Sequence, residues 1–417
     1  MNILIKSVTV IDPNSAYHGK EIDLSIEDGI IQISSKKASV FNETINGKGL
    51  LISPGWFDMR VNFYDPGFEY REGIKNGALT SAAGGFTGVA LLPETNPGIT
   101  GKSQVEYIIN QGRDNIVSIY PMGSILQESG ETISEMYDLL HAGAIAFSSG
   151  YKGIADEGLL LRAMQYSSTM DVPLVLSTIN KNLYGKGQMN EGLINVQIGM
   201  KGIPDVADEV EINKIISLCR YTNAKVHISG VSGIVALNLI LKAQEEGLKI
   251  TCDTTAHHLS FDENDLLNFN TQLKLRPPLR TQQDKIFLRN GVKNGTIQAV
   301  VSDHNPLEED KKKCEFEIAG FGASGTQTVY SQLVKCLGDQ EKIVSVLAIQ
   351  PREILGLKIP VINDGEIANI TLFDPEKKWI LNEESNQSKS RNHPLWQQEL
   401  SGKAIAIANN LQFRKLS

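Results

Sequence analysis

The sequence predicts an α/β protein, a (β/α)8 TIM-like barrel that carries a small β-sandwich domain built from both ends of the chain. Three observations support this fold class. Short apolar runs alternate with helical patterns through the middle of the chain, a turn at Pro54-Gly55 opens that region, and strand patterns return after residue 360. The predicted boundaries are residues 53–363 for the barrel and residues 1–52 with 364–417 for the β domain.

The first 52 residues contain short strand patterns separated by polar turns, at residues 3–10, 22–26, 30–34 and 45–52. After residue 360, the stretches 365–373 and 403–408 have the same character. Because strand patterns stand at both ends of the chain, we expect the two ends to join into one small β domain beside the barrel.

The middle of the chain supplies the alternation typical of a barrel, with roughly eight strands in about 300 residues. No glycine-rich phosphate-binding fingerprint follows the first strand, which disfavours an open doubly wound sheet. Apolar residues at helical spacing predict helices over residues 157–170, 209–221 and 231–246. The barrel strands after the first are expected at residues 88–92, 117–120, 144–147, 173–176, 225–228, 249–252 and 298–301.

Composition limits the classes of function. The 417-residue chain has a net charge of -8 and a pI near 5.5, which argues against nucleic acid as a main partner. No apolar run approaches the ~20 residues that span a bilayer, and the first residues lack the layout of a signal peptide. The four cysteines are scattered, so we expect reduced thiols in a cytoplasmic protein.

Several blocks, taken in order over nearly the whole chain, resemble the dihydroorotases of the amidohydrolase superfamily, of the longer type found with cyclic amidohydrolases such as hydantoinases. This resemblance implies a metal-dependent hydrolase barrel that opens or closes a cyclic amide in pyrimidine biosynthesis, with one or two zinc ions at its mouth. The blocks are PGWFDMRVNFYDPGFEYREGIKNGALTSAAGGFTGVALLPETNP (54–97), GAIAFSS (143–149), VHISGVS (226–232), ITCDTTAHHL (250–259), LKLRPPLR (273–280), AVVSDHNP (299–306), AGFGASGTQT (319–328) and SKSRN (388–392).

The metal positions implied by the resemblance are mostly replaced. A zinc ion in a catalytic site needs about three protein ligands, and a guanidinium cannot be one of them. The resemblance implies zinc, but we predict no bound metal because the ligands are absent. Only the aspartate that ends the strand AVVSD, Asp303, is retained, and we expect it to be non-catalytic here; the replaced positions are Arg60, Asn62, Ser149 with its neighbour Gly150, Ser177 and Gly230.

Without a metal, Asp303 needs another counter-charge, and Arg60 is placed to supply it. We therefore expect an Arg60–Asp303 pair in place of the metal, and a second compensating pair between Arg276 and Glu94. Tyr64, Glu94, Arg276 and Leu307 stand where the family has substrate-contacting residues. The candidates for contact with a substrate are Arg276, Asn96 and His304.

The histidines are weighed individually. Adjacent residues on a strand face opposite sides, so His257 and His258 favour a structural role, and His227 favours a buried, hydrogen-bonded one. His18, His141 and His393 have the sequence context of turn or surface positions. The run Lys311–Lys313 beside Glu308–Asp310 is expected to be a solvated loop.

Three functions remain open at this point. The first is a catalytically inactive, dihydroorotase-like subunit with a structural or regulatory role, for example with aspartate transcarbamoylase. The second is an active dihydroorotase or related cyclic amidohydrolase with a remodelled site, and the third is a ligand-binding sensor. A homodimer is expected from the resemblance, and neither nucleic acid nor membrane is expected as a partner.

Overall fold

A computed structural model describes residues 2–33 and 40–416, and it shows the expected parallel barrel. Residue 34, the last of the predicted strand 30–34, lies outside the described residues. The first three barrel strands form one hydrogen-bonded group and the remaining five, with β9 (Gly123–Ser124), form another. The eight barrel strands are β6 (Trp56–Val61), β7 (Phe86–Leu91), β8 (Ser118–Pro121), β10 (Phe147–Ser148), β11 (Leu174–Ser177), β14 (Val226–Ser229), β15 (Ile250–Thr255) and β16 (Ala299–Val301).

The barrel closes where its last strand meets its first. A parallel bridge joins Val61 at the end of β6 to His304 just after β16, and the backbone N–H of Asn62 donates to the carbonyl of His304 at 2.9 Å. This closure places the residues that follow β6 directly beside those that follow β16. In a parallel barrel all strand ends of one kind meet at one face, so these residues share the carboxyl-end mouth.

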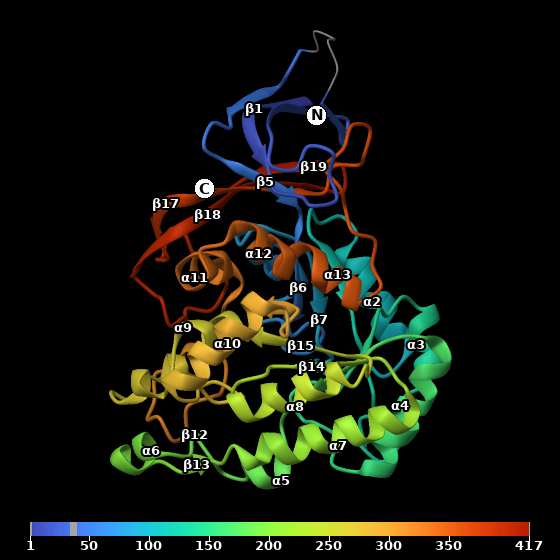
Figure 1. Cartoon of the computed structure of the whole chain (residues 1–417), viewed down its shortest axis with the longest axis vertical. Helices are drawn as coiled ribbons and strands as arrows, with labels where there is room; N and C mark the ends of the chain where they lie inside the picture. The colour runs from blue at the N-terminus through green and yellow to red at the C-terminus, as the bar shows by residue number, and fades with distance from the viewer. Residues whose placement is uncertain (1, 34–39, 417) are drawn as a thin grey trace.

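Both ends of the chain contribute to a single eight-stranded sheet with the order β19-β18-β17-β5-β1-β2-β3, in which β4 also pairs with β1. The small β domain of the predicted fold class is therefore confirmed. Figure 1 shows this sheet at one end of the molecule, with both chain termini in it and the barrel below. Its strands are β1 (Asn2–Val10), β2 (Glu21–Glu27), β3 (Ile30–Gln32), β4 (Glu43–Asn46), β5 (Leu51–Pro54), β17 (Ile370–Ile380), β18 (Glu399–Asn409) and β19 (Gln412–Lys415).

Helices follow the barrel strands and cover their outer face (Figure 1). The predicted helix over residues 157–170 is confirmed: the Asp156 side chain caps it by accepting from the N–H of Leu159, and Asp171 ends it at φ 56°. The helices are α1 (Ile74–Ala83), α2 (Lys102–Gly112), α3 (Met136–His141), α4 (Glu157–Met170), α5 (Lys181–Tyr184), α6 (Leu193–Ile198), α7 (Val206–Thr222), α8 (Ile234–Glu245), α9 (Ala256–Ser260), α10 (Gln282–Asn294), α11 (Val329–Cys336), α12 (Gln340–Val344) and α13 (Gln350–Ile354).

Trp56 joins the barrel to the β domain. Its ring is fully buried and lies 4.8 Å from the Tyr330 ring and 5.3 Å from the Phe373 ring, while its Nε1–H donates to Ser53 Oγ at 3.1 Å. Large aromatic side chains with a satisfied polar group contribute strongly to such junctions. The two parts of the fold thus share one continuous apolar core at this point. None of the described helices combines the length and the apolar character needed to cross a membrane.

Candidate functional site

The side chain of Arg60 lies buried at the barrel mouth and forms the predicted pair with Asp303. Its Nε donates to Asp303 Oδ1 at 2.6 Å, and both side chains are almost fully buried, with 2% and 7% exposed. The Arg60 Nη1 donates to Ser229 Oγ at 2.8 Å on the other side. The guanidinium therefore links residues from three strand ends, β6, β14 and the segment after β16.

A second carboxylate, Asp253 on β15, continues this network. Ser229 Oγ donates to Asp253 Oδ2 at 2.7 Å, the Gly230 N–H donates to Oδ1 at 2.6 Å, and His227 Nε2 lies 3.0 Å from Oδ2. Burial raises the pKa of Asp253, but hydrogen bonding and charge from His227, followed by Arg60, bring it below its usual value. His227 is fully buried and hydrogen-bonded, as the sequence indicated.

Tyr151, which the sequence did not single out, covers the Arg60–Asp303 pair. Its hydroxyl donates to Asp303 Oδ1 at 2.6 Å and accepts from Asn62 Nδ2 at 3.0 Å, and the Arg60 guanidinium carbon lies 4.9 Å from its ring centroid. Burial raises the pKa of Asp303 even though Arg60 and Tyr151 lower it. The contacts therefore bring Arg60, Asn62, Tyr151 and Asp303 into one closed cluster.

The residues of this cluster do not fit a zinc ion. A Cβ at Gly230 would lie 3.0 Å from Arg60 Nη1, so the guanidinium occupies the space that a side chain at residue 230 would need. A Cβ at Gly150 would overlap Glu94 Oε1, which accepts from the Tyr151 N–H at 2.8 Å. In the described parts of the chain, no group of three or more histidine, cysteine, aspartate or glutamate side chains is arranged to hold a metal ion.

The serines at the other replaced positions are occupied by local hydrogen bonds. Ser177 Oγ accepts from the N–H of Ile179 at 3.0 Å, and Ser149 Oγ accepts from the N–H of Ser177 at 3.0 Å. A neutral hydroxyl is a poor zinc ligand compared with imidazole, thiolate or carboxylate. The two hydroxyls accept backbone hydrogen bonds at the ends of β10 and β11, and they do not replace the missing metal ligands.

The expected pair between Arg276 and Glu94 is wrong. The Arg276 guanidinium carbon lies 4.1 Å from the centroid of the Phe321 ring, while Glu94 lies over Gly150 and bonds the backbone of Tyr151. Both residues lie on loops, and stacking on Phe321 holds the guanidinium by a cation–π contact instead of an ion pair. Burial lowers the pKa of Arg276, as expected for a half-buried cation that pairs with no described carboxylate.

A cavity of about 510 Å³ lies at the mouth beside this cluster, on the side of β7, β9 and β10. Asn96 lines it, whereas Arg276, His304, Arg60 and Asp303 do not. Of the replaced metal positions, Ser149 lines the cavity, whereas Asn62, Ser177 and Gly230 do not. Its lining mixes both charges with aromatic and hydroxyl groups, including Tyr64, Arg71, Glu94, Ser149 and Lys152.

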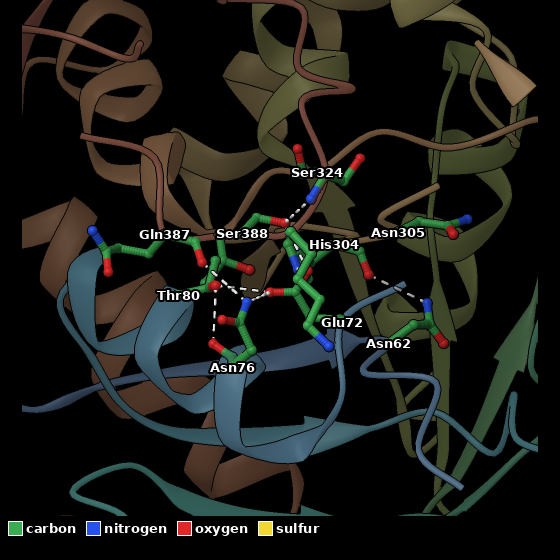
Figure 2. A network of polar contacts seen from close by, with 12 residues as sticks. Asn62, Glu72, Asn76, Thr80, His304, Asn305, Ser324, Gln387 and Ser388 are labelled. Carbon is green, nitrogen blue, oxygen red and sulfur yellow. Dashed lines mark hydrogen bonds and ion pairs between the residues drawn. The ribbon is translucent and has the colours of Figure 1, made fainter. Parts of the chain in front are cut away.

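His304 is fully buried and does not face the cavity. Figure 2 shows it among Asn62, Glu72 and Ser388. Its Nδ1 accepts from the Gly325 N–H at 3.2 Å, and its Nε2 lies 3.9 Å from Glu72 Oε2. Glu72 in turn accepts from Ser388 Oγ at 2.7 Å, which fastens the C-terminal segment to the barrel. A direct contact between His304 and a substrate is therefore not supported by this arrangement.

Other histidine expectations need correction. His257 and His258 lie in the short helix α9 after β15 and not on a strand, because the Thr255 side chain caps a helical turn there by accepting from the His258 N–H. His393 is buried, with 3% exposed, since its Nε2 pairs with Thr328 Oγ1 at 2.8 Å inside the fold. Lys312 is buried as well, so the loop at 311–313 is not uniformly solvated.

Replacing His257 with methionine is expected to reduce the sensitivity of the protein to acid. Burial lowers the pKa of His257 to about 4, against 6.5 for the free side chain. Between these values the unfolded chain binds a proton that the folded chain does not, so stability is lost as the pH falls. His257→Met should therefore lower the slope of the unfolding free energy against pH between 4 and 6.5 by about 1.4 kcal/mol per pH unit, measured by urea denaturation.

The matched control for this variant is His141→Met, because His141 is exposed on α3. Its slope should equal that of the wild type. An unchanged slope for His257→Met would show that His257 does not remain neutral in the folded state. Burial raises the pKa of Asp58 to about 7, which makes the folded state more stable as the pH falls. This contribution is the same in the wild type and in both variants, so it cancels when their slopes are compared.

The fold defines the class of protein. The structure superimposes on L-hydantoinase (dihydropyrimidinase) from Arthrobacter aurescens with a TM-score of 0.84 at 20% identity, covering 99% of this chain and 96% of that one. It matches D-hydantoinase (dihydropyrimidinase) from Thermus sp. with a TM-score of 0.82 at 16% identity, covering 99% of this chain and 95% of that one. These likenesses show the barrel with its small β domain that hydantoinases have.

Sequence comparison then gives the family. The chain is 34% identical to a dihydroorotase of Pelobacter propionicus over 426 residues, covering 100% of both, and 35% identical to one of Acetivibrio thermocellus over 408 residues, covering 96% of both. A model of the family described as Dihydro-orotase-like matches residues 49–234. The chain belongs to the dihydroorotase family.

Proposed function

We propose that this chain is a catalytically inactive, dihydroorotase-like protein that acts as a structural or regulatory subunit in pyrimidine biosynthesis, with aspartate transcarbamoylase as its partner. One observation carries the proposal: the guanidinium of Arg60 lies buried at the barrel mouth, pairs with Asp303 and occupies the space that a side chain at residue 230 would need. A site closed in this way cannot bind the ion on which the family's chemistry relies.

The physical consequence is large. Hydrolysis of an unactivated amide by this kind of site depends on a metal that lowers the pKa of bound water from about 15.7 to about 7 and polarises the carbonyl. Arg60 supplies positive charge but no open coordination position, and its charge is already neutralised by Asp303. The remaining groups of the cluster are engaged with one another, which favours a role in holding the fold together.

The first test is the metal content and dihydroorotase activity of the purified protein, with and without added Zn²⁺. We expect less than one tenth of an equivalent of zinc per chain and no activity above background. A chain that retains close to one equivalent of zinc and turns over dihydroorotate would overturn the proposal. That outcome would favour an active enzyme with a remodelled site.

The second test concerns the partner. Tagged protein is mixed with purified aspartate transcarbamoylase from the same cell, and the mixture is analysed by size-exclusion chromatography with light scattering. We expect a complex whose mass exceeds that of either component, whereas a hydantoinase of the same fold should not co-elute. Separate elution of the two proteins at micromolar concentration would contradict the scaffold role.

The cavity of about 510 Å³ favours ligand binding as a second candidate function, since its size lies within the range of small-molecule sites. The cavity lies beside the Arg60–Asp303 cluster, and its lining includes both charged and aromatic side chains. Binding of dihydroorotate without turnover, measured by calorimetry and lost in Arg71→Met, would support a sensor. If millimolar dihydroorotate does not bind, the sensor function is contradicted.

A further inference from the structure

A second cavity, of about 320 Å³, lies between the loop 307–313 and the segment 389–392 that contains the SKSRN block. Neither the barrel mouth nor the proposed subunit role accounts for it. Its wall carries more cations than carboxylates, which are Glu308 and Glu309, although the chain as a whole has a net charge of -8. The cations that line it are Arg71, Lys312, Lys313, Lys389 and Arg391.

Two of these cations are held only by exposed ion pairs. Arg391 Nη2 lies 2.7 Å from Glu383 Oε2, with 55% and 59% of the side chains exposed, and Lys313 pairs with Glu309, also exposed. Exposed pairs of this kind contribute little to stability, so a ligand can readily replace the carboxylate. Lys389 is exposed too, and its Nζ donates to the carbonyl of Glu69.

Lys312 lines the cavity but is itself buried. Lys312 is 2% exposed, and its Nζ donates to the carbonyl of Thr271 at 2.7 Å. The neighbouring Lys274, 1% exposed, donates to the carbonyl of Phe316 at 2.7 Å. Neither amine forms an ion pair with any described residue. Burial, and then the charge of Lys274, lowers the pKa of Lys312 to about 7, which shows how unfavourable two buried amines are without an anion nearby.

We propose that this cavity binds a small phosphate-bearing anion, with Arg391 and Lys389 of the C-terminal segment and Lys313 of the loop as its direct contacts. An arginine fork and lysine ammonium groups are the side chains that recognise phosphate oxygens most readily. The volume lies at the lower end of small-molecule sites, which suits a compact anion better than a peptide. The proposed site requires no catalysis and shares no residue with the Arg60–Asp303 cluster.

The test is calorimetric titration of the full-length protein with inorganic pyrophosphate. We expect saturable binding with one site per chain, weakened at least tenfold in the double variant Lys389→Met/Arg391→Gln. The matched control is Lys225→Met/Arg220→Gln, which removes one lysine and one arginine from exposed ion pairs with Asp171 and Glu246 on the opposite part of the barrel. Because both double variants change the net charge by the same amount, the control should bind as the wild type does.

Three outcomes would overturn the proposal. They are titrations that never saturate, equal losses in the two double variants, and citrate binding as tightly as pyrophosphate, which would show a general polyanion surface without a phosphate site. Thermal unfolding of each variant checks that it is folded, which is expected because Arg220, Lys389 and Arg391 are exposed and Lys225 is only partly buried.

Discussion

Replacing Arg60 with methionine is expected to destabilise the protein by about 3–5 kcal/mol, the cost of removing one partner from a buried ion pair. The substitution leaves Asp303 buried with only the Tyr151 hydroxyl as a side-chain partner, and it also removes the bond to Ser229. Urea denaturation at pH 7.5 measures the loss. The control Arg220→Met breaks an exposed pair with Glu246 and should cost at most about 1 kcal/mol.

Two further measurements separate the electrostatic cause from lost packing. Removing both charges, in Arg60→Met/Asp303→Asn, should cost less than Arg60→Met alone, because no uncompensated carboxylate remains and asparagine tolerates the φ of 50° at residue 303. Burial already raises the pKa of Asp303, and loss of Arg60 raises it further, so folding of the single variant takes up a proton. The loss of unfolding free energy in Arg60→Met, relative to the wild type, should therefore be smaller at pH 5 than at pH 8. A double variant no more stable than the single one, with a pH-independent deficit, would contradict the role of Arg60 as the counter-charge.

Replacing Gly85 with alanine is expected to destabilise the protein by about 3 kcal/mol, through backbone strain and overpacking together. Gly85 has a φ of 90°, and a Cβ there would lie 2.6 Å from Ala404 Cβ and 2.7 Å from the Trp56 ring. Trp56 is the residue that joins the barrel to the β domain. The substitution should therefore loosen this junction, which thermal unfolding and near-ultraviolet circular dichroism of the tryptophan both detect.

The control for the strain alone is Gly49→Ala. Gly49 has a similar φ of 83°, but nothing lies within 4 Å of a Cβ added there. It should lose only about 1–2 kcal/mol, the cost of a left-handed conformation for a residue with a side chain. Equal losses in the two variants would show that close packing against Trp56 contributes nothing at Gly85.

The fold was predictable because its signals are local. A strand or helix pattern such as residues 157–170 depends on side-chain periodicity and capping over a few residues, and the alternation of such elements limits the choice of topology. The chemistry of a single residue can be read in the same way. A guanidinium at residue 60 cannot ligate zinc in any conformation, whatever surrounds it.

The Arg60–Asp303 pair could also be predicted, although 243 residues separate its members. Arg60 lies near the end of the first barrel strand and Asp303 lies just after the last, and closure of the barrel puts these two strands side by side. The failed pair of Arg276 and Glu94 shows the limit of that reasoning. Both residues lie on loops beyond the strands, and the path of a loop is set by contacts that the strand pattern does not contain.

Local periodicity and the fixed properties of side chains were thus enough to predict the barrel, its β domain and the kinds of residue at the mouth. Which groups neutralise one another depends on how distant segments pack. Tyr151 and Asp253 enter the Arg60 cluster, and Lys312 is buried beside Lys274, through packing between segments that are distant in the chain. Burial and charge pairing are properties of that packing, so no short stretch of sequence carries them.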